Sequence, residues 1–143
     1  MTVRVERTMT VAASPERVWE FIGDPDQRAR PISVVEEWEI HDGDRATWHI
    51  SLPIPIVDRT VAVETEDVER REPEYVRFIG RSKVMRVQGE QELEPTDDGE
   101  TRVTNRFVVD GKLPGVERFF KRNLDEELRN LERALNDYIE SDR

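Results

Sequence analysis

The sequence predicts one α+β domain over residues 1–143, in which a curved antiparallel sheet of about seven strands wraps around a long C-terminal helix, with two short helices after the first strand. Three observations predict this fold. Seven stretches alternate apolar and polar residues with a period of two, as half-buried strands do. Turn sequences rich in Gly, Asp and Pro separate these stretches. The last segment, of roughly thirty residues, carries an apolar stripe at helical spacing.

The first strand is predicted over residues 3–11, where the odd-numbered positions are mainly apolar and the even-numbered ones are polar. A short helix follows, with Ser14 as its N-cap and Pro15 in its first turn. Gly23-Asp24-Pro25 ends this helix, and residues 26–30 can form a second short helix. The inward side chains of the first helix are predicted to be Val18, Trp19, Phe21 and Ile22.

Six further strands are predicted one after another, over residues 34–41, 46–52, 57–68, 75–79, 84–93 and 101–109. Short turn sequences join them, for example Asp42-Gly43-Asp44 and Thr96-Asp97-Asp98-Gly99. Short connections of this kind imply antiparallel neighbours, and a sheet of about seven strands curves as it twists.

A long helix is predicted from Pro114 to near the end of the chain. Its apolar positions recur every three or four residues, at Val116, Phe120, Leu124, Leu128, Leu131, Leu135 and Tyr138. About 27 residues at 1.5 Å each give a rod of roughly 40 Å. One amphipathic helix cannot fill the whole concave face of such a sheet, so we expect a gap between the two.

The composition excludes several classes of protein. The net charge is −10, from 32 acidic and 22 basic residues, which argues against a nucleic-acid-binding surface over the whole molecule. The absence of cysteine excludes disulfides, thiolate catalysis and cysteine-bound metals. No run approaches the ~20 apolar residues of a membrane span, and the first residues lack a signal-peptide core. We therefore expect a soluble, cytoplasmic protein.

Lysine is unusually scarce, because only Lys83, Lys112 and Lys121 are lysines among the 22 basic residues and the others are arginines. An acidic chain with little lysine resembles proteins adapted to high internal salt, in which a dense carboxylate surface maintains solubility. The alternative is a GC-rich genome that favours arginine codons. Either origin concerns the habitat of the protein rather than a partner.

A segment at the first strand-to-helix junction is distinctive, reading Ala13-Ser14-Pro15-Glu16-Arg17-Val18-Trp19-Glu20-Phe21-Ile22-Gly23-Asp24. Together with the order of elements and the Pro114-Gly115 start of the long helix, it resembles the START-like (SRPBCC, helix-grip) superfamily. That superfamily includes polyketide cyclases and dehydrases, coenzyme Q-binding proteins and plant lipid binders. The resemblance implies a helix-grip fold with a cavity for a hydrophobic small molecule such as a lipid, quinone or polyketide-like compound. We expect no cofactor.

Within this fold, we expect apolar side chains of the sheet and the helix to line the cavity. The candidates are Met9, Trp38, Trp48, Val61, Met85, Phe107, Phe120, Leu124, Leu128 and Leu131. Arg7 and Arg59 occupy the apolar phase of their strands, so their guanidinium groups could hold a carboxylate or enolate oxygen of a ligand. Alternatively, each turns outward or pairs with a buried acid. Gln91 and Asn105 also alternate with apolar neighbours and are expected to face the interior.

Metal binding and catalysis have little support in the sequence. His41 and His49 are the only histidines, one beside a turn and the other opposite the apolar phase of its strand, and no metal-ligand spacing includes them. No residue pattern is specific for a general acid or base. We therefore expect no metal site and leave catalytic residues unassigned.

The loops at one end of the predicted sheet are apolar and basic. They contain the Leu52-Pro53-Ile54-Pro55-Ile56 segment, with Arg81, Lys83 and Lys112 nearby. We expect Ile54, Ile56, Arg81, Lys83 and Lys112 to form the cavity mouth, where the cations attract an anionic ligand group or a lipid surface. Alternatively, Ile54 and Ile56 fold back onto Phe119 and Phe120 at the helix start.

Three functions remain open at this point. The first is binding or transport of a hydrophobic small molecule, which an all-apolar cavity would favour. The second is a cyclase or dehydratase acting on a polyketide-like substrate, with Arg7 or Arg59 polarising a carbonyl; a cavity with a paired, buried ionisable group would favour it. The third is an interaction module with a filled core that contacts a membrane or protein transiently through Leu52–Ile56. The sequence does not indicate the oligomeric state.

Overall fold

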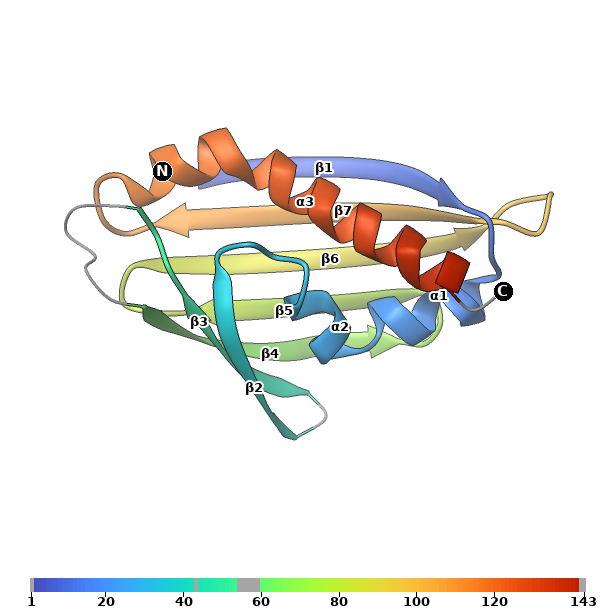
Figure 1. Cartoon of the computed structure of the whole chain (residues 1–143), viewed down its shortest axis with the longest axis horizontal. Helices are drawn as coiled ribbons and strands as arrows, with labels where there is room; N and C mark the ends of the chain where they lie inside the picture. Colours follow the sequence, from blue (N-terminus) through green and yellow to red (C-terminus); the bar gives the residue numbers. More distant parts are fainter. Residues whose placement is uncertain (1, 43, 54–59, 142–143) are drawn as a thin grey trace.

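The computed structural model describes residues 2–42, 44–53 and 60–141. The strands are β1 (Thr2–Val11), β2 (Val35–Asp42), β3 (Arg45–Ile50), β4 (Val61–Arg71), β5 (Tyr75–Arg81), β6 (Met85–Pro95) and β7 (Thr101–Gly111). The helices are α1 (Pro15–Ile22), α2 (Pro25–Ala29) and α3 (Val116–Ser141). The strands form one antiparallel sheet in the order β1-β7-β6-β5-β4-β3-β2 (Figure 1). This is the helix-grip fold that the sequence predicts, and that prediction is confirmed.

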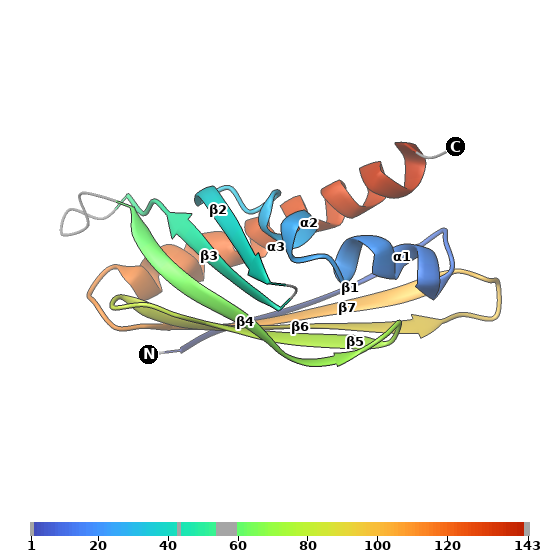
Figure 2. The same cartoon turned by 90° about the horizontal axis from the view of Figure 1, so that it is seen from below.

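The long helix α3 crosses the concave face of the sheet and packs on β1 and β7 (Figure 1). In the turned view, all three helices and the β2–β3 hairpin lie on one side of β4–β7 (Figure 2). Register shifts in the β2–β3 and β4–β5 pairs accompany this curvature, as bulges do in bent sheets. No helix in the described ranges is long and apolar enough to cross a membrane.

The two short helices connect β1 to the far edge of the sheet. The Ser14 hydroxyl accepts the Arg17 N–H at 3.3 Å, which caps α1 as the sequence predicts. A Cβ at Gly23 would lie 2.6 Å from the Trp19 ring, so only glycine fits at the end of α1. The Trp38 indole donates to Asp26 at 2.7 Å, which fastens α2 to β2.

Two apolar clusters fill the space between sheet and helices. The first cluster lies towards the start of α3 and includes Ile50, Val63, Phe107, Phe120 and Leu128. The second cluster lies under α1 and the far half of α3 and includes Val11, Trp19, Val103, Leu131 and Leu135. The inner face of the sheet thus has two separate apolar regions along α3.

Candidate functional site

A cavity of about 40 Å³ lies in the first cluster, between the sheet and α3. Its lining is formed by Ile32, Val34, Val35, Trp48, Ile50, Val63, Met85, Val87, Phe107, Val109, Phe120, Leu124, Glu127 and Leu128. All of these except Glu127 are apolar. Pockets for drug-sized ligands usually measure roughly 300–1,000 Å³, so a ligand of that size requires the walls of this cavity to move apart.

Six of the side chains expected to line the cavity do so: Trp48, Met85, Phe107, Phe120, Leu124 and Leu128. Met9 and Leu131 instead pack in the second cluster, because they lie further along β1 and α3 than the cavity extends. Trp38 and Val61 pack against the first cluster without lining the cavity. Arg59, Ile54 and Ile56 lie outside the described residues.

Several lining residues were not singled out from the sequence. Val63, Val87 and Val109 occupy the apolar phase of their strands, so the period-two pattern contained the signal that would have identified them. Ile32 and Val34 precede β2, where there is no alternation to indicate which side chain faces inward. Their placement depends on how that segment meets α3.

Glu127 is the charged residue of the cavity wall, and hydrogen bonds occupy both of its carboxylate oxygens. Oε1 accepts the Ser33 hydroxyl at 2.7 Å, the Ser33 N–H at 3.2 Å and the Asn130 amide at 2.9 Å. Oε2 accepts the Val34 N–H at 3.3 Å. The carboxylate therefore ties α3 to the segment before β2, across one side of the cavity. Glu127 lies three residues after Leu124 on the apolar stripe of α3, and this position was the available signal.

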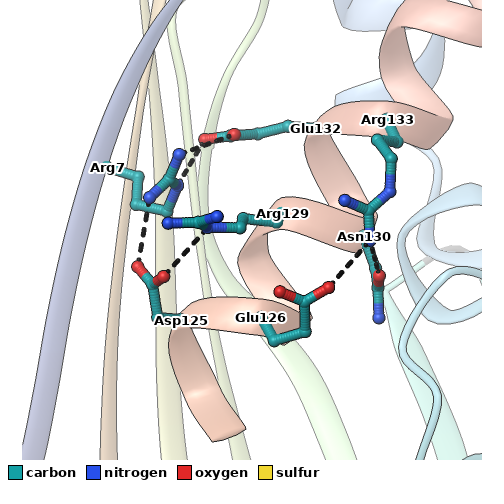
Figure 3. A network of polar contacts seen from close by, with 7 residues as sticks. All are labelled: Arg7, Asp125, Glu126, Arg129, Asn130, Glu132 and Arg133. Atoms are coloured by element: carbon teal, nitrogen blue, oxygen red, sulfur yellow. Dashed lines mark hydrogen bonds and ion pairs between the residues drawn. The ribbon is translucent and has the colours of Figure 1, made fainter.

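Arg7 points inward from β1, but two carboxylates of α3 occupy its guanidinium group (Figure 3). Nε donates to Glu132 at 3.0 Å and Nη1 donates to Asp125 at 3.1 Å, and Arg129 also donates to Asp125 at 3.0 Å. The hydrogen bond to Glu132 raises the pKa of Arg7 above its usual value. Arg7 lies outside the cavity lining and pairs with acids, which is the alternative that the sequence left open beside a contact with a ligand oxygen.

A second arginine, which is almost fully buried, forms an ion pair that the sequence did not reveal. Nη2 of Arg28 on α2 donates to Asp67 on β4 at 2.6 Å, and both side chains are almost fully buried. Arg70 also donates to Asp67, at 2.7 Å. Burial lowers the pKa of Arg28, although Asp67 opposes this effect. The pair anchors α2 to the sheet beside the Phe78 ring, over which the Arg28 guanidinium lies at 5.3 Å.

The interior positions expected for Gln91 and Asn105 are confirmed, with exposed fractions of 0% and 1%. The two histidines have separate partners: His41 contacts Thr47, and His49 contacts Glu39 at 2.9 Å. Among the residues that the structure describes, no three acidic or histidine side chains converge as a metal site would require.

One end of the molecule is basic, at the start of α3 and the neighbouring strand ends (left in Figure 1). We define this basic end as residues 2–4, 81–86 and 110–122, which contain eight basic and two acidic residues and thus carry +6, whereas the rest of the chain carries −16. Its cations are Arg4, Arg81, Lys83, Arg86, Lys112, Arg118, Lys121 and Arg122, all exposed. None of them has an ion-pair partner within the described ranges.

The expected contact loop begins at Leu52, which the sequence also places in the apolar phase of the strand predicted over residues 46–52. Only 4% of Leu52 is exposed, because it packs in the first cluster. Arg81, Lys83 and Lys112 are exposed, as cations at a cavity mouth would be.

Comparison with known proteins finds a matching family and several solved structures with the same fold. A family profile described as polyketide cyclase / dehydrase and lipid transport matches residues 2–136. A conserved protein from Geobacillus kaustophilus superimposes with a TM-score of 0.79 at 14% identity, covering 97% of this chain and 96% of the other. A START superfamily protein from Mycobacterium smegmatis gives 0.75 at 17% identity, covering 98% and 99%. The Zhui aromatase/cyclase from Streptomyces sp. R1128 gives 0.71 at 16% identity, covering 97% and 96%. No curated protein matches the sequence.

Proposed function

The chain belongs to the polyketide cyclase / dehydrase and lipid transport family, and on that basis we propose that it binds and carries a hydrophobic small molecule in the cavity between the sheet and α3. The observation that carries the proposal is the wall chemistry. Of the described lining residues, every one but Glu127 is apolar, and the carboxylate oxygens of Glu127 are occupied by hydrogen bonds. Such a wall favours an apolar ligand body and offers no free charge to a polar one.

A cyclase or dehydratase acting on a polyketide-like substrate is the second candidate, and a carboxylate in the cavity wall is the observation that favours it. Two features count against it. Glu127 accepts four hydrogen bonds, so a proton transfer would require breaking the tie to Ser33 and Val34. Of the two arginines expected to polarise a carbonyl, the structure describes Arg7, and its guanidinium group is bound to Asp125 and Glu132.

The ligand class that suits the site is a lipid, quinone or polyketide-like molecule, bound without a cofactor. Because about 40 Å³ is too small for such a molecule, binding must separate the cavity walls, most readily where β2 and β3 face α3. We propose that the basic end contacts an anionic lipid surface, where the ligand is exchanged, because its eight cations lack ion-pair partners in the described part of the chain.

Native mass spectrometry of the protein purified from its own host tests the carrier function. We expect an added mass of a few hundred daltons that organic extraction removes. Val109→Phe should fill the cavity and abolish the adduct, whereas Val108→Phe on the outer face of the same strand should retain it. A bare protein, or an adduct that is equal in both variants, would overturn the proposal. Release of a chemically altered compound would favour the enzyme.

A further inference from the structure

Two buried amides lie on the inner face of the sheet without the hydrogen bonds that such groups normally make. Gln91 on β6 and Asn105 on β7 are directly opposite each other in the register. Gln91 Nε2, Gln91 Oε1 and Asn105 Oδ1 have no hydrogen-bond partner among the residues that the structure describes. The large majority of buried polar side-chain atoms in proteins are paired, so three orphaned atoms in one cross-strand pair require an explanation.

The amide pair lies directly beside the cavity. Phe107, a lining residue, is two positions from Asn105 on the same face of β7, which is about 7 Å along a strand. On the neighbouring strand, Gly89 is opposite Phe107 and Gln91 is opposite Asn105. The pair therefore lies one step deeper than the cavity wall, where the first apolar cluster ends and the second begins.

The position of α3 supports the same placement. Arg7 is opposite Asn105 in the register, and its guanidinium reaches Asp125 and Glu132 on the helix. Leu128 lies between those two acids on the same face of α3 and also lines the cavity. Leu128 is thus a cavity residue on the stretch of α3 that Arg7 contacts, and a ligand that separates Leu128 from Phe107 would extend toward the amides.

We infer that Gln91 and Asn105 form a subsite that binds a hydroxyl group of the hydrophobic ligand. This inference rests on the proposed function and specifies the ligand class. The unpartnered Nε2 of Gln91 donates through its N–H groups, whereas Gln91 Oε1 and Asn105 Oδ1 are acceptors. A hydroxyl oxygen accepts from Gln91 Nε2 while its proton is donated to Asn105 Oδ1, which an ether or ester oxygen cannot do.

A carboxylate fits this subsite less well than an alcohol or phenol. Two of the three orphaned atoms are acceptors, which repel an anion. The nearest cation along the row, Arg7, is committed to Glu132 and Asp125. The ligand is therefore a neutral, hydroxyl-bearing apolar molecule such as a long-chain alcohol, sterol or phenol, rather than a free fatty acid.

The test compares 1-decanol with its isomer 1-methoxynonane, which has the same apolar bulk but no O–H to donate. Affinities are measured by isothermal titration calorimetry and by tryptophan fluorescence. We expect the alcohol to bind roughly tenfold more tightly, which corresponds to about 1.4 kcal/mol. Gln91→Met and Asn105→Leu should remove this preference. Gln88→Met is the matched control, because Gln88 lies on the same strand but on the outer face.

Thermal unfolding accompanies these measurements, since replacing an unpaired buried amide with an apolar side chain should leave the melting temperature unchanged or raise it. Equal affinity of the wild type for both isomers would overturn this inference while leaving hydrophobic binding intact. A preference that survives in Gln91→Met and Asn105→Leu would also overturn it. Binding of neither isomer would overturn it as well, and mass spectrometry of the host-purified protein then decides the proposed function independently.

Discussion

Arg7 on β1 and Glu132 on α3 are joined by two hydrogen bonds, from Nε to Oε2 at 3.0 Å and from Nη2 to Oε1 at 3.2 Å. The edge strand of the sheet is thereby fastened to the middle of the helix that covers it (Figure 3). An inward-facing arginine thus forms a structural contact and does not contribute a charge to the cavity.

Arg7→Met should lower the free energy of unfolding by about 1–2 kcal/mol, because it leaves the largely buried Glu132 without its partner. Adding Glu132→Leu should restore part of the lost stability. Urea unfolding of the wild type, the two single variants and the double variant measures the interaction energy of the pair. The affinity for 1-decanol should stay within about twofold, since Arg7 does not line the cavity. A tenfold loss of affinity would instead show that Arg7 orients the ligand.

Val109→Ile should raise the free energy of unfolding by about 0.5–1 kcal/mol, because one added methylene fits the cavity of about 40 Å³. The same change should weaken 1-decanol binding. Val103→Ile is the matched control on the same strand and face, where the side chain is fully buried in the second cluster and lines no described cavity, and it should cost about 1–3 kcal/mol. Chemical denaturation checks both, and a destabilised Val109→Ile would contradict the assignment of free space.

Glu127→Gln should lower the free energy of unfolding by about 1–3 kcal/mol, because the new amide would present a donor to the N–H of Ser33 or Val34. Loosening this tie should also speed association of 1-decanol in stopped-flow fluorescence. Glu126→Gln is the control, since Glu126 is exposed and pairs with Arg133 at the helix surface, and it should change stability by less than about 0.5 kcal/mol. Equal stability of the two variants would contradict the conclusion that Glu127 holds α3 to the segment before β2.

Tyr75 should make the protein less stable in strong alkali. Burial, aided by the hydrogen bond to Glu90, raises the pKa of Tyr75 from 10.0 to about 12; Glu69 adds to this shift and Arg77 opposes it. The folded state therefore keeps its proton where the unfolded state has lost it, and stability falls between about pH 10 and pH 12. Tyr75→Phe should abolish that fall, which is roughly 3 kcal/mol for a shift of two pKa units. Phenolate absorbance should lose its late transition, near pH 12, in this variant.

Arg86→Glu should weaken cosedimentation with vesicles containing phosphatidylglycerol by about fivefold or more, because each basic side chain near an anionic surface contributes about 1 kcal/mol. Arg45→Glu is the matched control, an exposed arginine outside the basic end that likewise has no ion-pair partner in the described residues. Both proteins should fail to bind neutral phosphatidylcholine vesicles. An equal loss of vesicle binding in the two variants would show that binding depends only on net charge. The proposal that the basic end contacts the lipid surface would then be wrong.

The sequence predicts the fold well because the fold depends on local periodicity. Alternation places Met85, Val87 and Phe107 inward, and the helical stripe does the same for Leu124 and Leu128. These patterns predict most of the cavity lining, because the cavity wall is made of the strand and helix faces that the patterns place inward.

Pairing between distant segments could not be read in the same way. Arg7 and Glu132 are 125 positions apart, and nothing local indicates which acid on α3 reaches β1. Glu127 is a similar case, because its partners Ser33 and Val34 lie more than ninety positions away and two of its bonds come from backbone N–H groups that any sequence provides. Such contacts depend on how the helix is placed over the sheet, which composition and spacing leave open.

The division of the interior into two apolar clusters along α3 determines where the folded protein can open locally. The half of α3 over the second cluster is buried against α1 and should exchange its backbone amide protons only through global unfolding. The half beside the cavity has free space next to it and should exchange through smaller, local openings. The protein can thus open at the first cluster to bind a ligand while the second cluster keeps the chain folded. The helix α3 spans both clusters and connects the part that opens to the part that stays closed.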